Sequence, residues 1–388
     1  IYAVPEGTVV FPGEPLLRFH GTTTEAMLLE TGLSMIMNHE SLIATKARRV
    51  RTVAPKDALM EFGLRRAQGH SAGLWGARAA MIGGFNGTSN VEAGKQFGIP
   101  VLGTMAHSWV MSFDEEIDAF REYVRQYHDN LILLADTYNV LEMGVPHAIQ
   151  VFKELKEEGR LPGKYGIRID SGDIAYLSQE ATRMFTEAGF PDVIISGSND
   201  LDEYTIQSLK AQGCTVTSWG VGTKIITADG TSALGGVFKM AVKEADGKEV
   251  PVMKFSNDVE KMTNPGIKTV YRFYKKDTGK MITDIVCLHD EKAADGGDFT
   301  LVTESAKWRR KELKAGTYTV EELLRPVVEN GRNLPLPALP EIIRYANTQM
   351  DTLWPEYTRL LNPDLMEINL SDKLQALKSE LIRRELGE

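Results

Sequence analysis

The residues with the clearest chemical potential lie in one run, Arg168-Ile169-Asp170-Ser171-Gly172-Asp173. The run continues a short apolar stretch, so a strand would deliver two carboxylates, a hydroxyl and a guanidinium to its carboxyl end. Alternation along a strand places Arg168 and Asp170 on the same face. A buried arginine needs an anion, which a substrate phosphate or carboxylate would supply. For Asp173 a helix N-cap is an equally good interpretation, because Asp is a preferred N-cap residue.

Two glycine-rich turns follow the next two apolar stretches, at residues 196–200 and 220–224. Backbone N–H groups in such turns bind phosphate without charged side chains. The alternative is that both are plain βα turns. Neither has the Gly-Lys-Ser/Thr ending of a Walker A loop. We predict phosphate contacts from the central residues of both turns: Gly197, Ser198, Gly220, Gly222 and Thr223.

A histidine and an aromatic residue follow two earlier apolar stretches. His107 lies among small residues in Gly103-Thr104-Met105-Ala106-His107-Ser108. Imidazole suits acid–base chemistry near neutral pH and nucleophilic attack on phosphorus; a hydrogen-bonded structural histidine is the alternative. In the segment 61–69, the ring of Phe62 and the guanidinium of Arg65 suit a planar anionic ring. The alternative for Phe62 is core packing.

A repeating unit of strand and helix between residues 58 and 235 must position these runs. Apolar stretches without period-2 alternation alternate there with longer segments of helical period, as is typical of parallel strands buried on both faces. A spacing of about 25 to 35 residues between the later strands suits a (β/α) barrel, whose active site lies on the loops after the strands. We expect strands at 58–60, 100–102, 131–135, 166–169, 193–195 and 216–219.

The fold class we predict is α/β, an irregular (β/α) barrel with a second, discontinuous β-rich α/β domain and a C-terminal helical extension. Residues 58–235 form the barrel. Residues 1–57 and 236–319 form the second domain, because hairpin-like segments after residue 235 would complete a sheet with N-terminal strands. Residues 320–388 have helical period and form the extension.

Within the second domain, helical spacing predicts one long helix from Thr24 to about Val53. Strands are expected on both sides of the barrel segment, at 8–11, 16–19, 237–242, 250–255 and 269–274.

Composition restricts the partners. The chain has 388 residues, 43% apolar and 25% charged, with a net charge of −9. No Lys/Arg cluster supplies the concentrated basic face that nucleic acids and anionic membranes require, whereas small anionic ligands remain compatible. No stretch has the 18 or more consecutive apolar residues of a membrane span. Two cysteines, Cys214 and Cys287, are too few for a disulfide scaffold, so we expect a cytoplasmic protein.

The sequence begins at Ile1 without an initiator Met and without the pattern of a signal peptide. We expect that a preceding segment is absent from it.

Taken together, five segments in series resemble nicotinate phosphoribosyltransferase, and the likeness runs from residue 1 to about residue 290. The segments are 61–69, 87–91, 103–108, 168–173 and 220–223. The resemblance implies a type II phosphoribosyltransferase, a homodimer with active sites at the subunit interface. It implies the reaction of nicotinate with phosphoribosyl pyrophosphate (PRPP) to give nicotinate mononucleotide and pyrophosphate, coupled to ATP hydrolysis, in NAD biosynthesis.

The resemblance also implies roles for individual residues. His107 matches the histidine that the family phosphorylates from ATP, and Asp170 matches an acidic residue near the ribose and base. Thr104 and Arg168 match positions that contact nicotinate. The remaining two matches are the ring-stacking position, Phe62, and a PRPP contact, Thr223.

Further expectations concern the metal and the partner subunit. We expect Mg²⁺ to bridge the pyrophosphate, with Asp170 orienting it directly or through water, and Arg168 to neutralise nicotinate or pyrophosphate. The resemblance does not specify the metal's ligands. We expect that the family's N-terminal segment, whose tyrosine completes the neighbouring subunit's nicotinate site, is missing from this sequence.

Two alternatives remain at this point. One is a sister phosphoribosyltransferase that uses quinolinate, which would need more basic residues, or nicotinamide, which would not need a guanidinium. The other is a catalytically inactive barrel that binds a phosphorylated metabolite. Retention of His107, Arg168 and Asp170 together disfavours the inactive barrel.

Overall fold

The structure of the protein, a computed structural model, describes residues 1–256, 262–292, 297–302 and 310–387. Parts of the segment 236–319 therefore lie outside the described residues.

The chain forms two compact units. The first unit comprises residues 1–37 and 235–388 and contains most of the expected second domain and the C-terminal extension. The second unit comprises residues 38–234 and contains the expected barrel. The first boundary, expected after residue 57, falls inside helix α1 (Thr23–Val53). The reason is packing. Only the C-terminal half of α1 has buried side chains, among them Ile43 and Val50, and this half belongs to the second unit.

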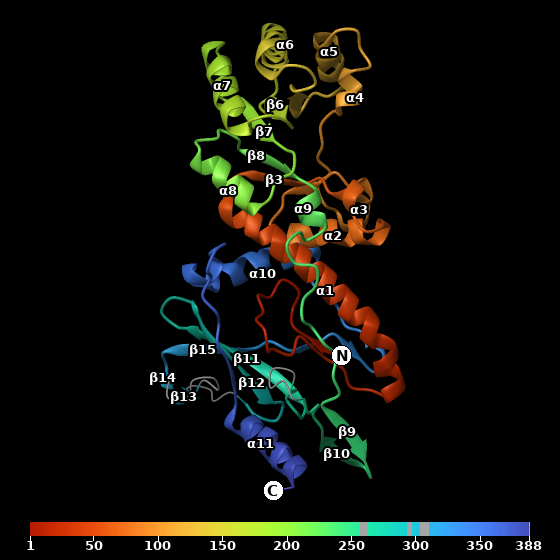
Figure 1. The fold of residues 1–388 in the computed structure, drawn as a ribbon, viewed down its shortest axis with the longest axis vertical. Helices are drawn as coiled ribbons and strands as arrows, with labels where there is room; N and C mark the ends of the chain where they lie inside the picture. Colours follow the sequence, from red (N-terminus) through yellow and green to blue (C-terminus); the bar gives the residue numbers. More distant parts are fainter. Residues whose placement is uncertain (257–261, 293–296, 303–309, 388) are drawn as a thin grey trace. The chain divides into compact units, whose positions relative to one another are not determined.

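A curled, open sheet of six parallel strands organises the second unit, in the order β4-β3-β8-β7-β6-β5 (Figure 1). It is the half-barrel form of the expected irregular barrel. The strands are β3 (Ala58–Glu61), β4 (Gly87–Thr88), β5 (Leu131–Leu134), β6 (Tyr165–Ile169), β7 (Ile194–Gly197) and β8 (Ser218–Val221).

Helices cover this sheet because its strands are apolar on both faces. All four residues of β5 are buried, for example. Four large aromatic side chains form one contact group between strand and helices: Phe152, Tyr165, Phe185 and Phe190. The helices of the unit besides α1 are α2 (His70–Ile82), α3 (Val91–Phe97), α4 (His107–Val110), α5 (Glu116–Gln126), α6 (Val145–Glu157), α7 (Ile174–Glu187), α8 (Glu203–Ala211) and α9 (Thr223–Ile226).

The prediction of one strand in the half-barrel is wrong. Residues 100–102 form no strand; Val101 makes only an isolated bridge to Thr88, and the strand at this place is β4. Pro100 has no N–H to donate, which limits pairing at this position. Strand β4, which lies where no strand was expected, therefore supplies the sheet edge.

A second sheet, in the order β15-β11-β12-β19, organises the first unit. Its long strands β11 (Lys268–Lys275) and β12 (Met281–Leu288) pair antiparallel, and β15 (Tyr318–Glu322) and β19 (Ile368–Leu370) flank them. Helices α10 (Leu339–Thr352) and α11 (Asp372–Leu386) complete the unit.

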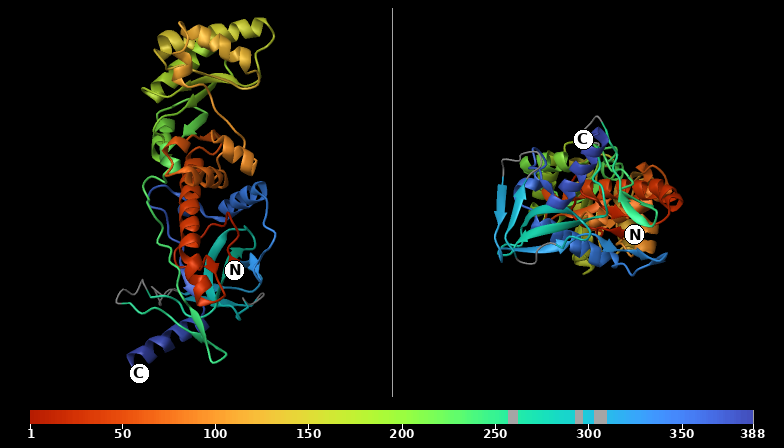
Figure 2. Two further views of the ribbon diagram at one scale, coloured as in Figure 1. Left: turned by 90° about the vertical axis from the view of Figure 1, so that its right-hand side faces the viewer. Right: turned by 90° about the horizontal axis from the view of Figure 1, so that it is seen from below.

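Short strand pairs surround this sheet. The pair β9 (Val242–Ala245) and β10 (Lys248–Pro251) forms a two-stranded ribbon of its own (Figure 2). The others are β1 (Tyr2–Ala3) between β2 (Leu17–Arg18) and β16 (Arg325–Pro326), β13 (Phe299–Val302) with β14 (Arg310–Leu313), and β17 (Val328–Glu329) with β18 (Arg332–Asn333).

Several expected elements of this unit are wrong. Residues 8–11 form no strand, because the amide of Phe11 donates to the Glu14 carboxylate instead of a neighbouring strand. The strands expected at 237–242 and 250–255 are replaced by β9 and β10, which pair around Asp246-Gly247.

The C-terminal helical extension begins later than expected. The strands β15 to β18 occupy the segment from Tyr318 to Asn333, and helix starts only with α10. Asn330 and Gly331 both have positive φ, 50° and 72°. An Asn-Gly pair in this conformation is a typical hairpin turn, and it joins β17 to β18.

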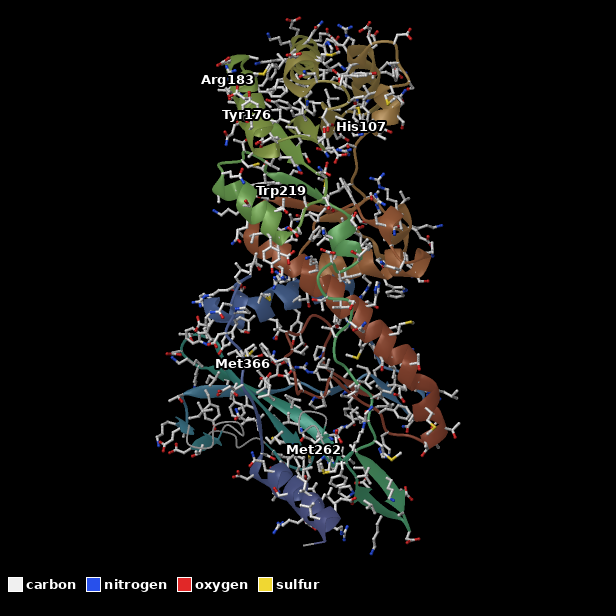
Figure 3. The ribbon with its side chains drawn as sticks, in the orientation of Figure 1. His107, Tyr176, Arg183, Trp219, Met262 and Met366 are labelled. Atoms are coloured by element: carbon white, nitrogen blue, oxygen red, sulfur yellow. The ribbon has the colours of Figure 1, made fainter. Side chains whose placement is uncertain are left out.

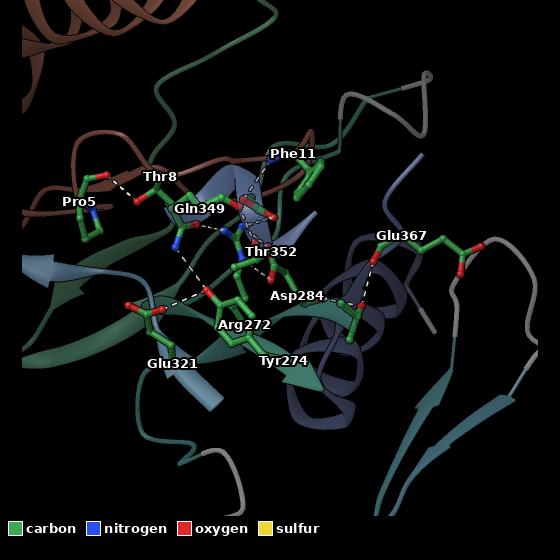
Figure 4. Close-up of polar contacts among 12 residues, drawn as sticks. Pro5, Thr8, Phe11, Arg272, Tyr274, Asp284, Glu321, Gln349, Thr352 and Glu367 are labelled. Carbon is green, nitrogen blue, oxygen red and sulfur yellow. Dashed lines mark hydrogen bonds and ion pairs between the residues drawn. The ribbon is translucent and has the colours of Figure 1, made fainter. Parts of the chain in front are cut away.

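A buried polar cluster ties the N-terminal segment to the second sheet (Figure 4). The fully buried Arg272 of β11 donates to Asp284 of β12 at 2.6 Å and to Gln349 of α10 at 2.9 Å. Glu14 places Oε1 3.9 Å from the same guanidinium. Its pKa is raised to about 9, first by burial and then by the neighbouring Asp284.

In the part of the chain that the structure describes, no helix is both long enough and apolar enough to cross a membrane.

Candidate active site

The loops after the parallel strands converge because the strands end level with one another. Leu134 of β5 pairs with Arg168 of β6, and Ile169 of β6 pairs with Gly197 of β7. The residues that follow each strand therefore meet at the carboxyl edge of the sheet, the usual place for ligands in α/β proteins.

His107 is the first residue of α4, after Ala106 in extended conformation (Figure 3). Its Nε2 lies 3.2 Å from Oδ1 of Asp136. The His107 side chain is 40% exposed, whereas that of Asp136 is 1% exposed. The imidazole is therefore accessible to a ligand on one side and held by a buried carboxylate on the other.

Asp136 was not among the predicted site residues. It follows the buried strand β5 by two positions, at the place where a parallel strand delivers site residues. That position was the available signal, but no motif surrounds this single aspartate.

The second oxygen of Asp136 holds the loop after β6. Oδ2 accepts from the amide of Asp170 at 3.0 Å and from the hydroxyl of Ser171 at 2.6 Å. One buried carboxylate thus connects His107 to the loop that carries Asp170.

Arg168 and Thr104 are also brought together. Nη1 of Arg168 donates to Oγ1 of Thr104 at 2.5 Å, and Nη2 lies 3.7 Å from Oδ2 of Asp170. Burial lowers the pKa of Arg168, while the charges of Asp170 and Asp136 oppose the shift. Its buried Nε has no hydrogen-bond partner among the described residues. The Nε–H of Arg168 and the positive charge of its guanidinium, which Asp170 and Asp136 compensate only in part, favour the binding of an anion beside Arg168.

The glycine-rich turn after β7 differs in detail from the expectation. The amide of Ser198 donates to the carbonyl of Ile169 at 3.0 Å, so this N–H is used by the sheet. The hydroxyl of Ser198 donates to Oδ1 of Asp170 at 2.6 Å. Any phosphate contact from Ser198 would therefore need a group other than its amide, and its hydroxyl positions Asp170.

Phe62 lies against the end of β8 and the turn that follows it. A Cβ at Gly220 would lie 2.6 Å from Cδ2 of the Phe62 ring, and one at Gly222 would lie 3.0 Å from the Phe62 carbonyl oxygen. The two glycines therefore allow the ring to approach the backbone. Thr223 begins the short helix α9 directly after this turn.

Glu61, the buried residue directly before Phe62, was also not among the predicted site residues. Glu61 is fully buried and accepts from Thr88 at 2.6 Å and from the amide of Gly63. Burial raises the pKa of Glu61, while these donors lower it. The contacts join β3 to β4 and fix the turn that carries Phe62, so Glu61 supports the site from within the sheet.

Arg65 lies on an exposed 3-10 turn, Leu64–Arg66. Its positive charge lowers the pKa of Arg168, so the two guanidinium groups share one electrostatic environment. The structure thus links His107, Asp170, Arg168 and Thr104 through direct contacts or through Asp136, and Ser198 joins them through Asp170. No described hydrogen bond or ion pair joins Phe62, Arg65 or Thr223 to that group.

Comparison with known families decides what kind of site this is. Residues 58–291 match the Nicotinate phosphoribosyltransferase (NAPRTase) family, and residues 267–378 match the Nicotinate phosphoribosyltransferase C-terminal domain.

The chain belongs to the nicotinate phosphoribosyltransferase family.

The similarity to curated relatives extends over nearly the whole length of this chain. The nicotinate phosphoribosyltransferase of Bacillus subtilis is 41% identical over 385 residues, which cover 98% of this chain and 77% of that protein. The human protein of the same name is 33% identical over 436 residues, covering 98% and 79%. The chain is accordingly an enzyme of this family.

Solved structures agree with the nicotinate phosphoribosyltransferase fold. The crystal structure of human Nicotinic Acid Phosphoribosyltransferase matches with a TM-score of 0.83 and 31% identity, covering 98% of this chain and 82% of that one. Nicotinate-nucleotide pyrophosphorylase from Pyrococcus furiosus matches with a TM-score of 0.69 and 25% identity, covering 90% and 80%.

Proposed function

We propose that this enzyme joins nicotinate to PRPP to give nicotinate mononucleotide and pyrophosphate, coupled to ATP hydrolysis through a phosphohistidine at His107, in NAD biosynthesis. The observation that carries the proposal is the hydrogen-bonded chain from His107 through Asp136 to the loop of Asp170, with Arg168 beside it. A nucleophile, a carboxylate and a buried guanidinium at one sheet edge are what this reaction needs.

The contact of His107 with Asp136 supports the phosphorylation step. If Nε2 of His107 carries the proton and donates a hydrogen bond to Oδ1 of Asp136, the lone pair of Nδ1 is available for bonding. Nδ1 attacks the γ-phosphorus of ATP, the N–P bond forms, and the P–O bond to ADP breaks with its electrons leaving on ADP. The buried carboxylate stabilises the positive charge that the imidazole gains. Hydrolysis of the N–P bond drives the overall reaction forward.

The transfer step separates charge at the ribose. The C1–O bond to pyrophosphate breaks with its electrons leaving on pyrophosphate, and the ring nitrogen of nicotinate bonds to C1 through an oxocarbenium-like state. The carboxylate of Asp170 favours the developing cation, while Arg168, helped by Thr104, pairs with the carboxylate of nicotinate or with pyrophosphate. Phe62 would stack on the pyridine ring, and Arg65 would add positive charge.

The ribose 5′-phosphate would be held by the turns after β7 and β8. Gly222 and Thr223 offer backbone groups after β8, whereas Gly197 and Gly220 lie in the last residues of the strands that lead into these turns. Ser198 would donate its hydroxyl to the phosphate in place of Asp170. Holding the phosphate at a set distance from nicotinate is catalysis by orientation.

The donor set near Asp170 suits a Mg²⁺ ion that is bound mainly through substrate. No group of three or more His, Cys, Asp or Glu side chains in the described part of the chain could hold a metal ion. Mg²⁺ often uses one or two carboxylates together with substrate phosphates, and the Asp170 side chain is 30% exposed. Asp170 would hold the ion directly or through water, and the bound ion would stabilise the departing pyrophosphate.

We further propose a cytoplasmic homodimer with active sites at the subunit interface. What supports a dimer is an exposed apolar surface on the N-terminal half of α1, because such surfaces mark protein contacts. Its residues are Met27, Leu28, Met35 and Ile36.

A substrate comparison tests the proposal. The protein is incubated with PRPP and, in parallel, nicotinate, nicotinamide or quinolinate, with and without ATP. We expect product from nicotinate and stimulation by ATP. His107→Ala should retain slow transfer and lose both the stimulation and the label transferred from γ-labelled ATP. Full stimulation of this variant would contradict the role of His107, and preference for another base would contradict the substrate.

A further inference from the structure

A second buried pair of carboxylate and imidazole begins on α5, the helix that contacts α4, where His107 lies. Nε1 of Trp109 in α4 donates to the carbonyl of Ala119 in α5 at 3.3 Å. Glu116 is the first residue of α5, and its side chain is fully shielded from solvent. Its Oε2 lies 2.8 Å from Nδ1 of His147, in the first turn of α6. The proposed reaction assigns no role to either residue.

The electrostatics connect this pair to the site. Burial raises the pKa of Glu116, the contact with His147 lowers it, and the charge of Asp136 raises it. A charge on Glu116 and a charge on Asp136 therefore act on each other across the interior of the unit. Oε1 of Glu116 has no hydrogen-bond partner among the described residues, so His147 carries most of the compensation.

Few other charged groups face Glu116. From the neighbouring elements, His147 on α6 and Asp136 after β5 are the groups that act on it. On α5 itself, Glu115 and Asp118 are exposed, and Asp118 contacts Arg121 at 3.3 Å. Solvent screens such exposed charges far more than buried ones.

We propose that Glu116 and His147 are positioning residues for the reaction at His107, holding a second negative charge close to Asp136 that favours positive charge on the imidazole. The inference deepens the proposed function and rests on it. Nδ1 of His147 donates to Oε2 of Glu116, and this carboxylate carries the negative charge of the pair. Together with Asp136, that charge stabilises the imidazolium-like ring that forms when Nδ1 of His107 bonds to phosphorus while Nε2 keeps its proton.

A measurement that needs no turnover tests this charge. Diethyl pyrocarbonate modifies neutral imidazole, and peptide mass spectrometry follows the rate at His107 separately from the other histidines as a function of pH. In Glu116→Gln, we expect the midpoint of this dependence to fall by about 0.5 pH unit, the effect of removing one charge at intermediate distance. Glu116→Asp keeps the charge and should keep the wild-type midpoint.

A second variant should shift the midpoint at His107 in the same direction for a different reason. In His147→Asn, Glu116 loses the contact that lowers its pKa, so a larger share of this carboxyl is protonated and the midpoint should move in the same direction as in Glu116→Gln. The His147 side chain is 24% exposed, so this variant decides the matter if Glu116→Gln does not fold. Glu115→Gln is the matched control, because it removes an exposed carboxylate one residue away.

The outcomes separate the two proposals. The positioning role is overturned if the folded Glu116 and His147 variants keep the wild-type midpoint, or if Glu115→Gln shifts it equally. If the Glu116 and His147 variants keep the wild-type midpoint, their ATP-stimulated rates should also keep the wild-type pH profile. Failure of the proposed function would appear differently, as wild-type protein that takes up no label from γ-labelled ATP at His107, whatever the midpoints are.

Discussion

Oδ1 of Asp136 lies 3.2 Å from Nε2 of His107, so a fully buried carboxylate orients an imidazole that is itself open to ligand. The other oxygen of Asp136 binds the loop after β6 through Asp170 and Ser171. The histidine and the acidic loop therefore cannot move independently, and a change at Asp136 should affect both.

Asp136→Asn should slow phosphorylation of His107 by about 10²-fold or more, in the range that a positioned acid–base partner contributes. An amide has only one oxygen and cannot accept from both His107 and Ser171. Rapid quenching with γ-labelled ATP measures the rate. Asp173→Asn is the matched control, because Asn remains a good cap for α7. Wild-type phosphorylation in Asp136→Asn would show that the contact is only structural.

Arg168→Lys should weaken the discrimination between nicotinate and nicotinamide. Lysine keeps the charge but loses the planar fork that binds a carboxylate with two hydrogen bonds and also reaches Thr104. We expect kcat/KM for nicotinate to fall by about 10²-fold, a loss of about 3 kcal/mol, and that for nicotinamide to fall less. Arg183→Lys, on the exposed face of α7, should change neither value. Equal losses for both substrates would contradict a role in recognising the carboxylate.

The strand-and-helix pattern and the loops after β6, β7 and β8 could be predicted because each depends on local sequence. Apolar runs without alternation indicate buried parallel strands, and parallel strands bring their carboxyl ends to one edge. This reasoning placed Arg168, Asp170 and Ser198 correctly at the edge of the sheet.

The remaining features depend on pairing between distant segments. Asp136 has no surrounding motif, and only the pairing of β5 with β6 brings it to the amide of Asp170. The same holds for Glu14, whose position near Arg272 no local pattern encodes. The strands in residues 318–333 were missed for a different reason, since the Asn330-Gly331 turn was a local hairpin signal that outweighs helical spacing.

Gly220→Ala should displace the Phe62 ring. The new Cβ would lie 2.6 Å from Cδ2 of that ring, closer than such atoms approach, and Ser198 restricts the other side at 3.3 Å. We expect KM for nicotinate to rise several-fold, measured by steady-state kinetics. A Cβ at Gly163 meets no atom within 4 Å, so Gly163→Ala is the control. An unchanged KM for nicotinate would argue that Phe62 serves only to pack the core.

Glu14 should make stability fall as the pH rises. Its pKa is about 9 in the folded protein against an ordinary 4.5, first because of burial and then because of the neighbouring Asp284 carboxylate. Between these values the folded protein holds a proton that the unfolded chain has lost. The free energy of unfolding therefore decreases with pH, by up to about 1.4 kcal/mol per pH unit. The contribution is complete below pH 4.5 and lost above pH 9.

Glu14→Gln isolates this contribution, because the amide has nearly the same shape and does not titrate. Urea unfolding of both proteins across this pH range should show a free-energy difference that moves in favour of the variant as the pH rises. Lys268, whose pKa burial lowers to about 8 from 10.5, acts in the opposite direction between those two values and cancels in the comparison. Glu6→Gln, at an exposed position of the same segment, should run parallel to the wild type. If Glu14→Gln also runs parallel, the carboxyl of Glu14 is not protonated in the fold, and Arg272 balances two carboxylates instead of one.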